Sequence, residues 1–242
     1  LSIIFFTAIE QNDDLSNRQN TFIGHHLLVP KEGVAIHINA FNFPVWGMLE
    51  KISVNLLAGM PAVVKPATVS CYLAEVVVKD IIASGILPEG ALQLICGSAR
   101  NLLDFVTSQD VVTFTGSAST GRMLRSNRKM IEESVPFNME ADSLNCIVLA
   151  PDVEPGHAEW DIFVKEVKKE MTVKAGQKCT AIRRIFVPEN KMEDAWKAIA
   201  AELDKTTIGN PLNEKVRMGS MAGLTQREEV RAQVQKLLAS SA

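Results

Sequence analysis

The chain has 242 residues, of which 47% are hydrophobic, and a formal net charge of −3. This length and apolar content are sufficient for one large or two modest globular domains with packed cores. The slightly acidic balance, without a long block of like charge, excludes the broad basic surface of a nucleic-acid-binding protein, so we expect no nucleic acid as partner.

Four cysteines and four histidines show neither CxxC nor HExxH spacing. We therefore expect no metal site and no redox dithiol, and reduced thiols favour a cytoplasmic protein. The first apolar run is too short to span a bilayer and lacks the basic start of a signal peptide, so no membrane segment is expected. Because the chain begins with Leu1 rather than Met, we expect it to be a piece of a longer polypeptide.

The first residues predict an arm ahead of the main fold. Residues 1–20 have the pattern of a helix end followed by a polar linker, NDDLSNRQN. Residues 21–34 contain two short extended pieces separated by Pro30 to Gly33, which predicts a hairpin or edge ribbon. Such a ribbon is typical of an arm that joins subunits of an oligomer.

From Gly33 to Arg125, short apolar runs alternate with helical patterns. The predicted strands are 33–40, 61–65, 91–97 and 110–116, and the predicted helices are 45–58, 71–84 (with Ser70 as its N-cap), 101–107 and 118–125. Strands without clean polar alternation, separated by helices, predict a parallel sheet buried on both faces. The predicted fold class is α/β with a Rossmann-like, nucleotide-binding sheet.

A second α/β segment is predicted from Asp142, which divides the chain into domains 1–141 and 142–242. A helix is predicted before Cys179, ended by Gly176, with one apolar face formed by Trp160, Phe163, Val164, Val167 and Met171. A strand at RRIFVPE, a helix at 191–206 and an amphipathic C-terminal helix follow, the last with Val230, Val234, Leu237 and Leu238 on one face.

Cys179 is a candidate nucleophile. It lies in TVKAGQKCTAIRR, between a glycine-containing turn and a short stretch of small side chains, where a side chain is presented rather than packed. A thiol needs nearby backbone N–H groups or cations to be reactive. The alternative is that Cys179 is a small buried apolar residue, as free cysteines often are.

Four further stretches with candidate residues end predicted strands, where ligands of α/β sheets gather. Asn42 lies in NAFNFPVWG, Lys65 in VVKPATVS, Gly116 and Ser117 in FTGSASTG, and Glu140 in FNMEADS. Gly116 and Ser117 open a helix whose N–H groups suit a phosphate. Glu140 lies in an otherwise apolar strand, where a buried carboxylate is costly without a purpose. Ordinary turn, surface and capping roles remain open alternatives for all of them.

Taken together, these stretches resemble the aldehyde dehydrogenase superfamily over nearly the whole chain, from about Phe22 to Ala242. The dehydrogenase half of the bacterial ring-opening proteins of phenylacetate degradation is most similar, in the stretches HINAFNFPVWG, KPATVS, LICGSA, DVVTFTGSASTG, FNMEADSLNC and KAGQKCTAIRR. The resemblance implies that residues 1–141 form a cofactor-binding domain and residues 142–242 a catalytic domain truncated at its C-terminus.

The resemblance also implies roles. Cys179 is the nucleophile that attacks an aldehyde, Asn42 and the Cys179 N–H hold the oxyanion, and Glu140 is the general base for hydrolysis of the thioester. Lys65, Thr68, Gly116 and Ser117 bind the cofactor. The implied substrate is an aldehyde, in this subgroup a coenzyme A thioester semialdehyde, and a homo-oligomer and a following enoyl-CoA hydratase domain are implied for the full-length protein.

Three departures from the family pattern qualify these implications. The common Glu-Leu-Gly-Gly is Glu140-Ala141-Asp142-Ser143 here, which keeps the carboxylate. The later Glu-x-Phe-Gly-Pro segment is absent, so we expect this piece to be inactive alone. NAD-preferring relatives commonly have glutamate where Thr68 stands, so we expect NADP as cofactor, with NAD possible. A non-catalytic nucleotide-binding fragment, a stand-alone semialdehyde dehydrogenase of another pathway and a cofactor-free cysteine acyltransferase are the alternatives.

Overall fold

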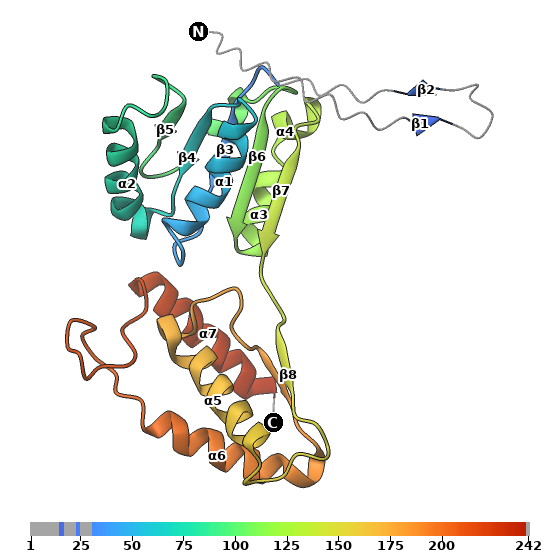
Figure 1. The fold of residues 1–242 in the computed structure, drawn as a ribbon, viewed down its shortest axis with the longest axis vertical. Helices are drawn as coiled ribbons and strands as arrows, with labels where there is room; N and C mark the ends of the chain where they lie inside the picture. The colour runs from blue at the N-terminus through green and yellow to red at the C-terminus, as the bar shows by residue number, and fades with distance from the viewer. Residues whose placement is uncertain (1–14, 17–22, 25–30, 241–242) are drawn as a thin grey trace. The chain divides into compact units, whose positions relative to one another are not determined.

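A computed structural model describes residues 15–16, 23–24 and 31–240 of the chain. It divides into two compact units, Leu1–Ala141 and Asp142–Ala242. Figure 1 follows the chain from blue to red through both units. Each unit has its own strands, helices and core.

The first unit is built on a five-stranded sheet of order β5-β4-β3-β6-β7, in which all neighbours are parallel (Figure 1). The strands are β3 (Ala35–Ile38), β4 (Ala62–Lys65), β5 (Leu92–Leu94), β6 (Val111–Gly116) and β7 (Phe137–Ala141). The chain runs outward from β3 to β5 and then returns to the other side of β3, so the order reverses between β3 and β6. Reversals of this kind place ligands at the carboxyl ends of the strands. The predicted Rossmann-like sheet is confirmed.

Helices cover both faces of this sheet. They are α1 (Trp46–Leu57), η1 (Thr68–Ser70), α2 (Cys71–Ala83), η2 (Leu102–Phe105), α3 (Ala118–Arg125) and α4 (Arg128–Glu132). One core joins α1 and α2 to β4 and β5, through Met48, Ile52, Ala62, Val64, Ala74, Val78 and Leu92. The other joins η2 and α4 to β3 and β6, through Ile36, Ile38, Leu103, Val106, Val112, Phe114, Met130 and Val135. Apolar burial on both faces explains why these strands lack polar alternation.

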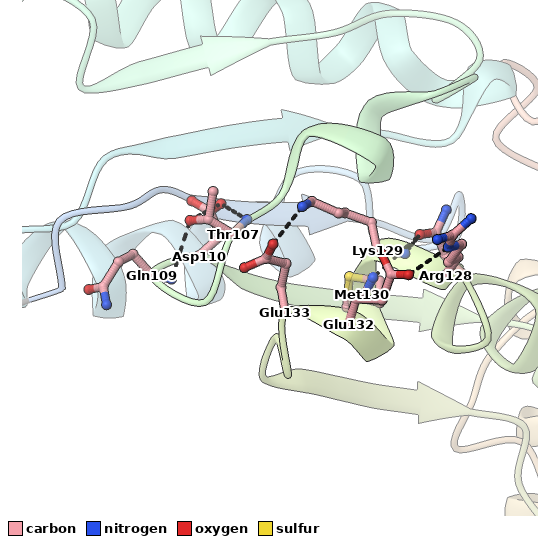
Figure 2. Close-up of polar contacts among 9 residues, drawn as sticks. Thr107, Gln109, Asp110, Arg128, Lys129, Met130, Glu132 and Glu133 are labelled. Carbon is pink, nitrogen blue, oxygen red and sulfur yellow. Dashed lines mark hydrogen bonds and ion pairs between the residues drawn. The ribbon is translucent and has the colours of Figure 1, made fainter.

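Polar contacts fix the turn that enters β6 and support helix α4, and Figure 2 shows those between Thr107 and Asp110 and along α4. The carboxylate of Asp110 accepts hydrogen bonds from the Thr107 N–H at 2.6 Å and from the Val34 N–H at 2.7 Å. Helix α4 carries two ion pairs at i,i+4 spacing, Arg128 with Glu132 at 2.6 Å and Lys129 with Glu133 at 2.5 Å. Five residues are too few for a hydrophobic period, so the sequence did not predict α4.

Two details of the first unit bear on the sequence predictions. Strand β2 (Ile23–Gly24), which lies within the predicted hairpin segment, pairs antiparallel with β1 (Leu15–Ser16), which precedes it in the chain. Residues 1–14, 17–22 and 25–30, which hold the predicted helix end and most of the predicted hairpin, lie outside the described residues. Ser70 precedes α2 as expected, but its side chain is buried and makes no cap hydrogen bond.

The second unit packs helices against a short parallel pair of strands, β8 (Cys146–Val148) and β9 (Arg184–Phe186). Its helices are α5 (Ala158–Thr172), η3 (Val173–Gly176), η4 (Glu189–Lys191), α6 (Met192–Asp204) and α7 (Leu224–Ser240). The core contains Leu149, Trp160, Phe163, Val164, Val167, Ala195 and Ile199. Four of the five residues on the apolar face predicted before Cys179 are therefore buried.

Three details of the second unit differ from the expectation or extend it. Met171, the fifth predicted core residue of α5, is 44% exposed because it lies in the last turn of the helix. The helix ends at Thr172, before Gly176, and left-handed Lys174 and Ala175 turn the chain sharply in η3. Along α7, Val230, Val234, Leu237 and Leu238 are all exposed. Among the described helices, none has the length and apolar character needed to cross a membrane.

Candidate functional site

The carboxyl edge of the sheet gathers most of the predicted site residues of the first unit. Lys65 ends β4, Gly116 ends β6, and Glu140 lies opposite Thr115 near the end of β7. Asn42 is half-buried in the bend that joins β3 to α1. Because parallel strands present their carboxyl ends at one edge, these side chains from distant parts of the sequence share one side of the unit.

Gly116 and Ser117 form the transition from β6 into α3. The Ser117 hydroxyl accepts a hydrogen bond from the Thr120 N–H at 3.3 Å and so caps the helix. A Cβ atom at Gly116 would lie 2.6 Å from the ring of Phe114. At Gly121 a Cβ would lie 2.4 Å from the sulfur of Met139, so α3 packs closely on the sheet. The N-terminus of α3 therefore opens at the carboxyl edge, where its dipole and N–H groups suit a phosphate.

Lys65 and Thr68 lie beside each other at the end of β4. Burial lowers the pKa of the Lys65 ammonium, and the neighbouring Cys71 acts in the opposite direction. Thr68 opens η1, is exposed, and donates from its hydroxyl to the carbonyl of Gly97 at 3.5 Å. A half-buried cation and an exposed hydroxyl are suitable groups for the ribose or phosphate of a nucleotide.

Two cysteines meet next to this edge, which their sequence spacing did not predict. Cys71 begins α2, and Cys96 follows β5. The pKa of the Cys96 thiol is raised, first by burial and then by a hydrogen bond with Cys71. The absence of a CxxC pattern therefore did not reveal that these two thiols influence each other.

Glu140 lies in an environment that decides between its two sequence-based alternatives. Its side chain is 60% exposed, which agrees with a surface glutamate and disagrees with a buried carboxylate; β7 is an edge strand of the sheet in the part of the chain that the structure describes. The Lys51 ammonium, from α1, lies 3.7 Å from a Glu140 oxygen and 3.1 Å from Glu50. Lys51 was missed from the sequence because only the packing of α1 against the sheet brings it to Glu140.

Buried polar groups continue along the same strands. His37 is 2% exposed, with one ring nitrogen 2.8 Å from the Thr113 hydroxyl and the other 2.7 Å from the Asn55 oxygen. Burial lowers the pKa of His37, opposed by the Asn55 hydrogen bond. Closer to the edge, Asn39 is 5% exposed, and neither polar atom of its side chain has a partner among the described residues. Buried amides of this kind favour a polar ligand or water nearby.

Cys179 belongs to the second unit, where it is exposed on a turn. The turn is closed by a hydrogen bond from the Ala181 N–H to the Lys178 carbonyl at 3.4 Å. The exposure of Cys179 on a turn agrees with a thiol that is accessible to a ligand. It disagrees with the alternative that Cys179 is a small buried apolar residue.

Two lysines lie near this turn. Lys178, with a side chain only 9% exposed, donates to Glu170 at 2.8 Å and ties the turn to α5. The pKa of Lys174 is lowered by burial and then by the charge of Lys178, whereas Cys179 acts to raise it. A thiolate at Cys179 would thus have positive charge in its surroundings.

Comparisons with known proteins identify the family of the chain. A model of the aldehyde dehydrogenase family matches residues 6–242. The chain belongs to the aldehyde dehydrogenase family. It is 48% identical over 210 residues to a 3,4-dehydroadipyl-CoA semialdehyde dehydrogenase of Aromatoleum evansii, covering 87% of this chain and 41% of the relative. It is 28% identical to a 3-sulfolactaldehyde dehydrogenase of Priestia aryabhattai, covering 87% of this chain and 43% of the relative. The chain thus spans less than half the length of these relatives.

Solved structures show the same fold. A betaine aldehyde dehydrogenase from Staphylococcus aureus superimposes with a TM-score of 0.77 at 22% identity, over 87% of this chain and 41% of that chain. The same enzyme solved in complex with NAD+ gives a TM-score of 0.76 at 22% identity, over 85% of this chain and 40% of that chain. At this identity the likeness establishes the family fold.

The residues of the first unit fit a dinucleotide. The α3 N-terminus, the half-buried Lys65 ammonium and the exposed Thr68 hydroxyl are donors suited to phosphate and ribose oxygens, all at the carboxyl edge. Of the seven residues predicted for the site, Asn42, Lys65, Thr68, Gly116, Ser117 and Glu140 lie in the first unit, and Cys179 lies in the second.

Proposed function

We propose that the complete protein oxidises an aldehyde to a carboxylic acid with NADP or NAD as cofactor, through a covalent intermediate on Cys179. The exposure of Cys179 on its turn, in a chain that belongs to the aldehyde dehydrogenase family, is the observation that supports this most directly. The proposed substrate class is a coenzyme A-linked semialdehyde of aromatic catabolism, supported by the 48% identity to a dehydrogenase of that class.

The proposed chemistry begins at Cys179. The thiolate attacks the aldehyde carbon, a carbon–sulfur bond forms, and the electron pair of the carbonyl moves to oxygen. The Asn42 amide and the Cys179 N–H hold that oxyanion, and each such donor contributes about 3 kcal/mol in comparable sites. As the oxyanion re-forms the carbonyl, the C–H bond breaks and a thioester on Cys179 results; a bound nicotinamide cofactor would supply the acceptor for that hydride. Glu140 then takes a proton from the water that hydrolyses the thioester, which releases the acid and the thiol.

The position of Glu140 supports hydrolysis rather than transfer to free coenzyme A. A thiol nucleophile needs less help from a base than water does, so a carboxylate here is useful mainly for water. Its exposed side chain is accessible to solvent, and the Lys51 ammonium lies 3.7 Å from one of its oxygens.

Cofactor choice is proposed to depend on Thr68. A carboxylate at this position would repel a 2′-phosphate, whereas the Thr68 hydroxyl carries no charge and Lys65 supplies a cation at the end of the same strand. We therefore propose NADP as the preferred cofactor. The ratio of kcat/KM for NADP to kcat/KM for NAD measures this preference. Thr68→Glu should shift the ratio toward NAD by about tenfold or more, which corresponds to a loss of ~1.4 kcal/mol in the binding of the 2′-phosphate. A wild-type preference for NAD would contradict the proposal.

The whole protein is further proposed to be a cytoplasmic homo-oligomer in which residues 1–242 are inactive without the rest of the catalytic domain. If the same polypeptide also contains an enoyl-CoA hydratase domain, the protein is of the bifunctional ring-opening type. If it does not, the protein is a stand-alone semialdehyde dehydrogenase. The mass of the complete subunit and its hydratase activity distinguish these two forms.

The test of the proposed function is a turnover assay of the complete protein. The wild type should reduce cofactor with a coenzyme A-linked semialdehyde and more slowly with the same semialdehyde lacking coenzyme A. Cys179→Ala should abolish turnover but keep cofactor affinity, since the thiol enters only the acyl chemistry. The matched control is Cys146→Ala, another exposed cysteine of the second unit, which should keep activity. Cofactor binding without turnover by the wild type would favour a non-catalytic nucleotide-binding protein instead.

A further inference from the structure

The two peptide groups on either side of Cys179 are held by side chains from outside the turn. The Lys178 carbonyl accepts a hydrogen bond from Arg183 Nη2 at 2.9 Å, in addition to the Ala181 N–H at 3.4 Å. The Cys179 carbonyl accepts from Asn145 Nδ2 at 2.5 Å and from the Ser143 hydroxyl. These hydrogen bonds restrict the rotation of both peptide groups.

The anchoring groups are themselves fixed to β8 and β9. The Asn145 carbonyl accepts hydrogen bonds from the N–H groups of Arg183 at 2.8 Å and Arg184 at 3.2 Å, where the two strands begin. Asn145 Nδ2 also lies 3.3 Å from the Ala181 carbonyl and 3.2 Å from the Ser143 hydroxyl. The turn is thus fastened to the start of a strand pair rather than left as a loose loop.

Arg183 acts on one particular peptide, the one between Lys178 and Cys179. A trans peptide is planar, and its C=O and N–H point in opposite directions. Fixing the Lys178 carbonyl therefore fixes the direction of the Cys179 N–H. A cation on the carbonyl also polarises the amide, which strengthens the N–H as a donor.

The Cys179 N–H is unused within the part of the chain that the structure describes, where it donates to no other group. In a β-turn the N–H of the second residue points outward, and the turn from Lys178 to Ala181 places Cys179 at that position. The donor is therefore adjacent to the thiol and available to an incoming ligand.

We propose that Arg183 is a positioning residue, which orients and polarises the Lys178–Cys179 peptide so that the Cys179 N–H stabilises the oxyanion formed when the thiolate attacks the aldehyde. This rests on the proposed function. In the attack the carbon–sulfur bond forms, the carbonyl π pair moves to oxygen, and the N–H meets that negative charge. The effect is electrostatic and requires no contact between Arg183 and the substrate.

Arg183→Ala in the complete protein tests this, with two readouts that separate orientation from folding. One is kcat and KM for aldehyde oxidation. The other is the rate at which iodoacetamide alkylates Cys179, a displacement at saturated carbon that forms no carbonyl oxyanion. We expect kcat/KM to fall about 10- to 100-fold, while the alkylation rate stays within about twofold because the thiol itself is intact.

Two further variants complete the experiment. Arg183→Lys, which keeps a cation on a long side chain, should recover part of the lost activity. Arg231→Gln removes an exposed arginine of α7, paired with Glu228, and should match the wild type. Oxidation by Arg183→Ala equal to the wild type, or an equal fall in oxidation and alkylation, would overturn the proposal. If the wild type alkylates at Cys179 but oxidises no aldehyde, the proposed function itself is wrong.

Discussion

The carboxyl edge of the sheet and the turn of Cys179 position their polar groups in different ways. At the edge, Lys65, Gly116 and Glu140 occupy the ends of parallel strands, so sheet topology alone brings them to one side. At the turn, Cys179 is held by hydrogen bonds from side chains to backbone carbonyls, through Ser143, Asn145 and Arg183.

The difference shows that the sheet edge depends on the apolar core, whereas the Cys179 turn depends on a few polar side chains. The strands that form the edge are covered by apolar cores on both faces of the sheet. Substitutions that disturb this packing or the backbone should therefore alter the edge by lowering the stability of the first unit. The turn rests on a few polar contacts near solvent, so single side chains should alter reactivity there with little effect on folding.

The largest effect should come from Glu140→Gln, which changes the edge without changing its packing. Steady-state turnover should fall about 10²- to 10⁴-fold, the usual contribution of a general base. Hydride transfer precedes the water step, so the variant should still give a burst of reduced cofactor and then stall. Rapid-mixing absorbance detects the burst. As a control, Glu50→Gln removes the other carboxylate on Lys51 and should turn over normally, whereas loss of the burst in Glu140→Gln would assign that residue an earlier role.

Lys191→Met should destabilise the second unit by about 2–4 kcal/mol, because the buried ammonium bonds two backbone carbonyls and a carboxylate. Its partners are Pro151 at 2.8 Å, Val153 at 2.5 Å and Glu154 at 2.7 Å. Lys197→Met, which breaks only an exposed pair with Glu193, should stay within about 0.5 kcal/mol. Urea unfolding compares the two, and equal midpoints would show that the buried contacts do not stabilise this unit.

Gly33→Ala should destabilise the first unit by about 1–3 kcal/mol through overpacking. A Cβ there would lie 2.5 Å from the backbone of Gln109, which cannot move aside as a side chain can. Gly47→Ala, within α1, is the matched change. The nearest neighbour of its Cβ, the Phe43 Cβ, would be 4.0 Å away, so the change should be neutral or stabilise the helix by up to about 1 kcal/mol. Thermal unfolding decides; a stable Gly33→Ala would mean that the entry to β3 is more adaptable than its contacts indicate.

The smallest expected effect is a pH dependence from His37. Its pKa in the folded protein is lowered from 6.5 by burial, so the neutral form contributes stability above pH 6.5 that is lost as the pH falls toward the lower folded value. The slope from one proton is at most about 1.4 kcal/mol per pH unit. His37→Gln should therefore lose less stability than the wild type between pH 7 and pH 5.5 in denaturant titrations. Parallel curves would mean that His37 does not take up a proton on unfolding.

The sequence predicted the sheet edge better than the turn, for a physical reason. Apolar strands followed by helices are local patterns, and the parallel sheet they form places Lys65 and Gly116 without further information. No local sequence pattern indicated that Lys51 or Arg183 contributes to the site. Lys51 reaches Glu140 only through the packing of α1, and Arg183 reaches Lys178 only through the geometry of a turn.

The exposure of Glu140 shows the same limit. Its apolar neighbours in the sequence left burial and exposure as alternatives, and the position of β7 at the edge of the described sheet goes with an exposed side chain. Whether a strand is central or at an edge depends on the order of the whole sheet, which its own residues do not encode.

The most direct test of the account is to locate the covalent intermediate. The Glu140→Gln form of the complete protein would be mixed with a semialdehyde and cofactor, quenched in acid, and digested for peptide mass analysis. The account predicts one acyl group on the peptide that contains Cys179, in an amount equal to the burst of reduced cofactor, and none without cofactor. A burst with an unmodified Cys179 peptide, or an acyl group on Cys71, Cys96 or Cys146 instead, would contradict it.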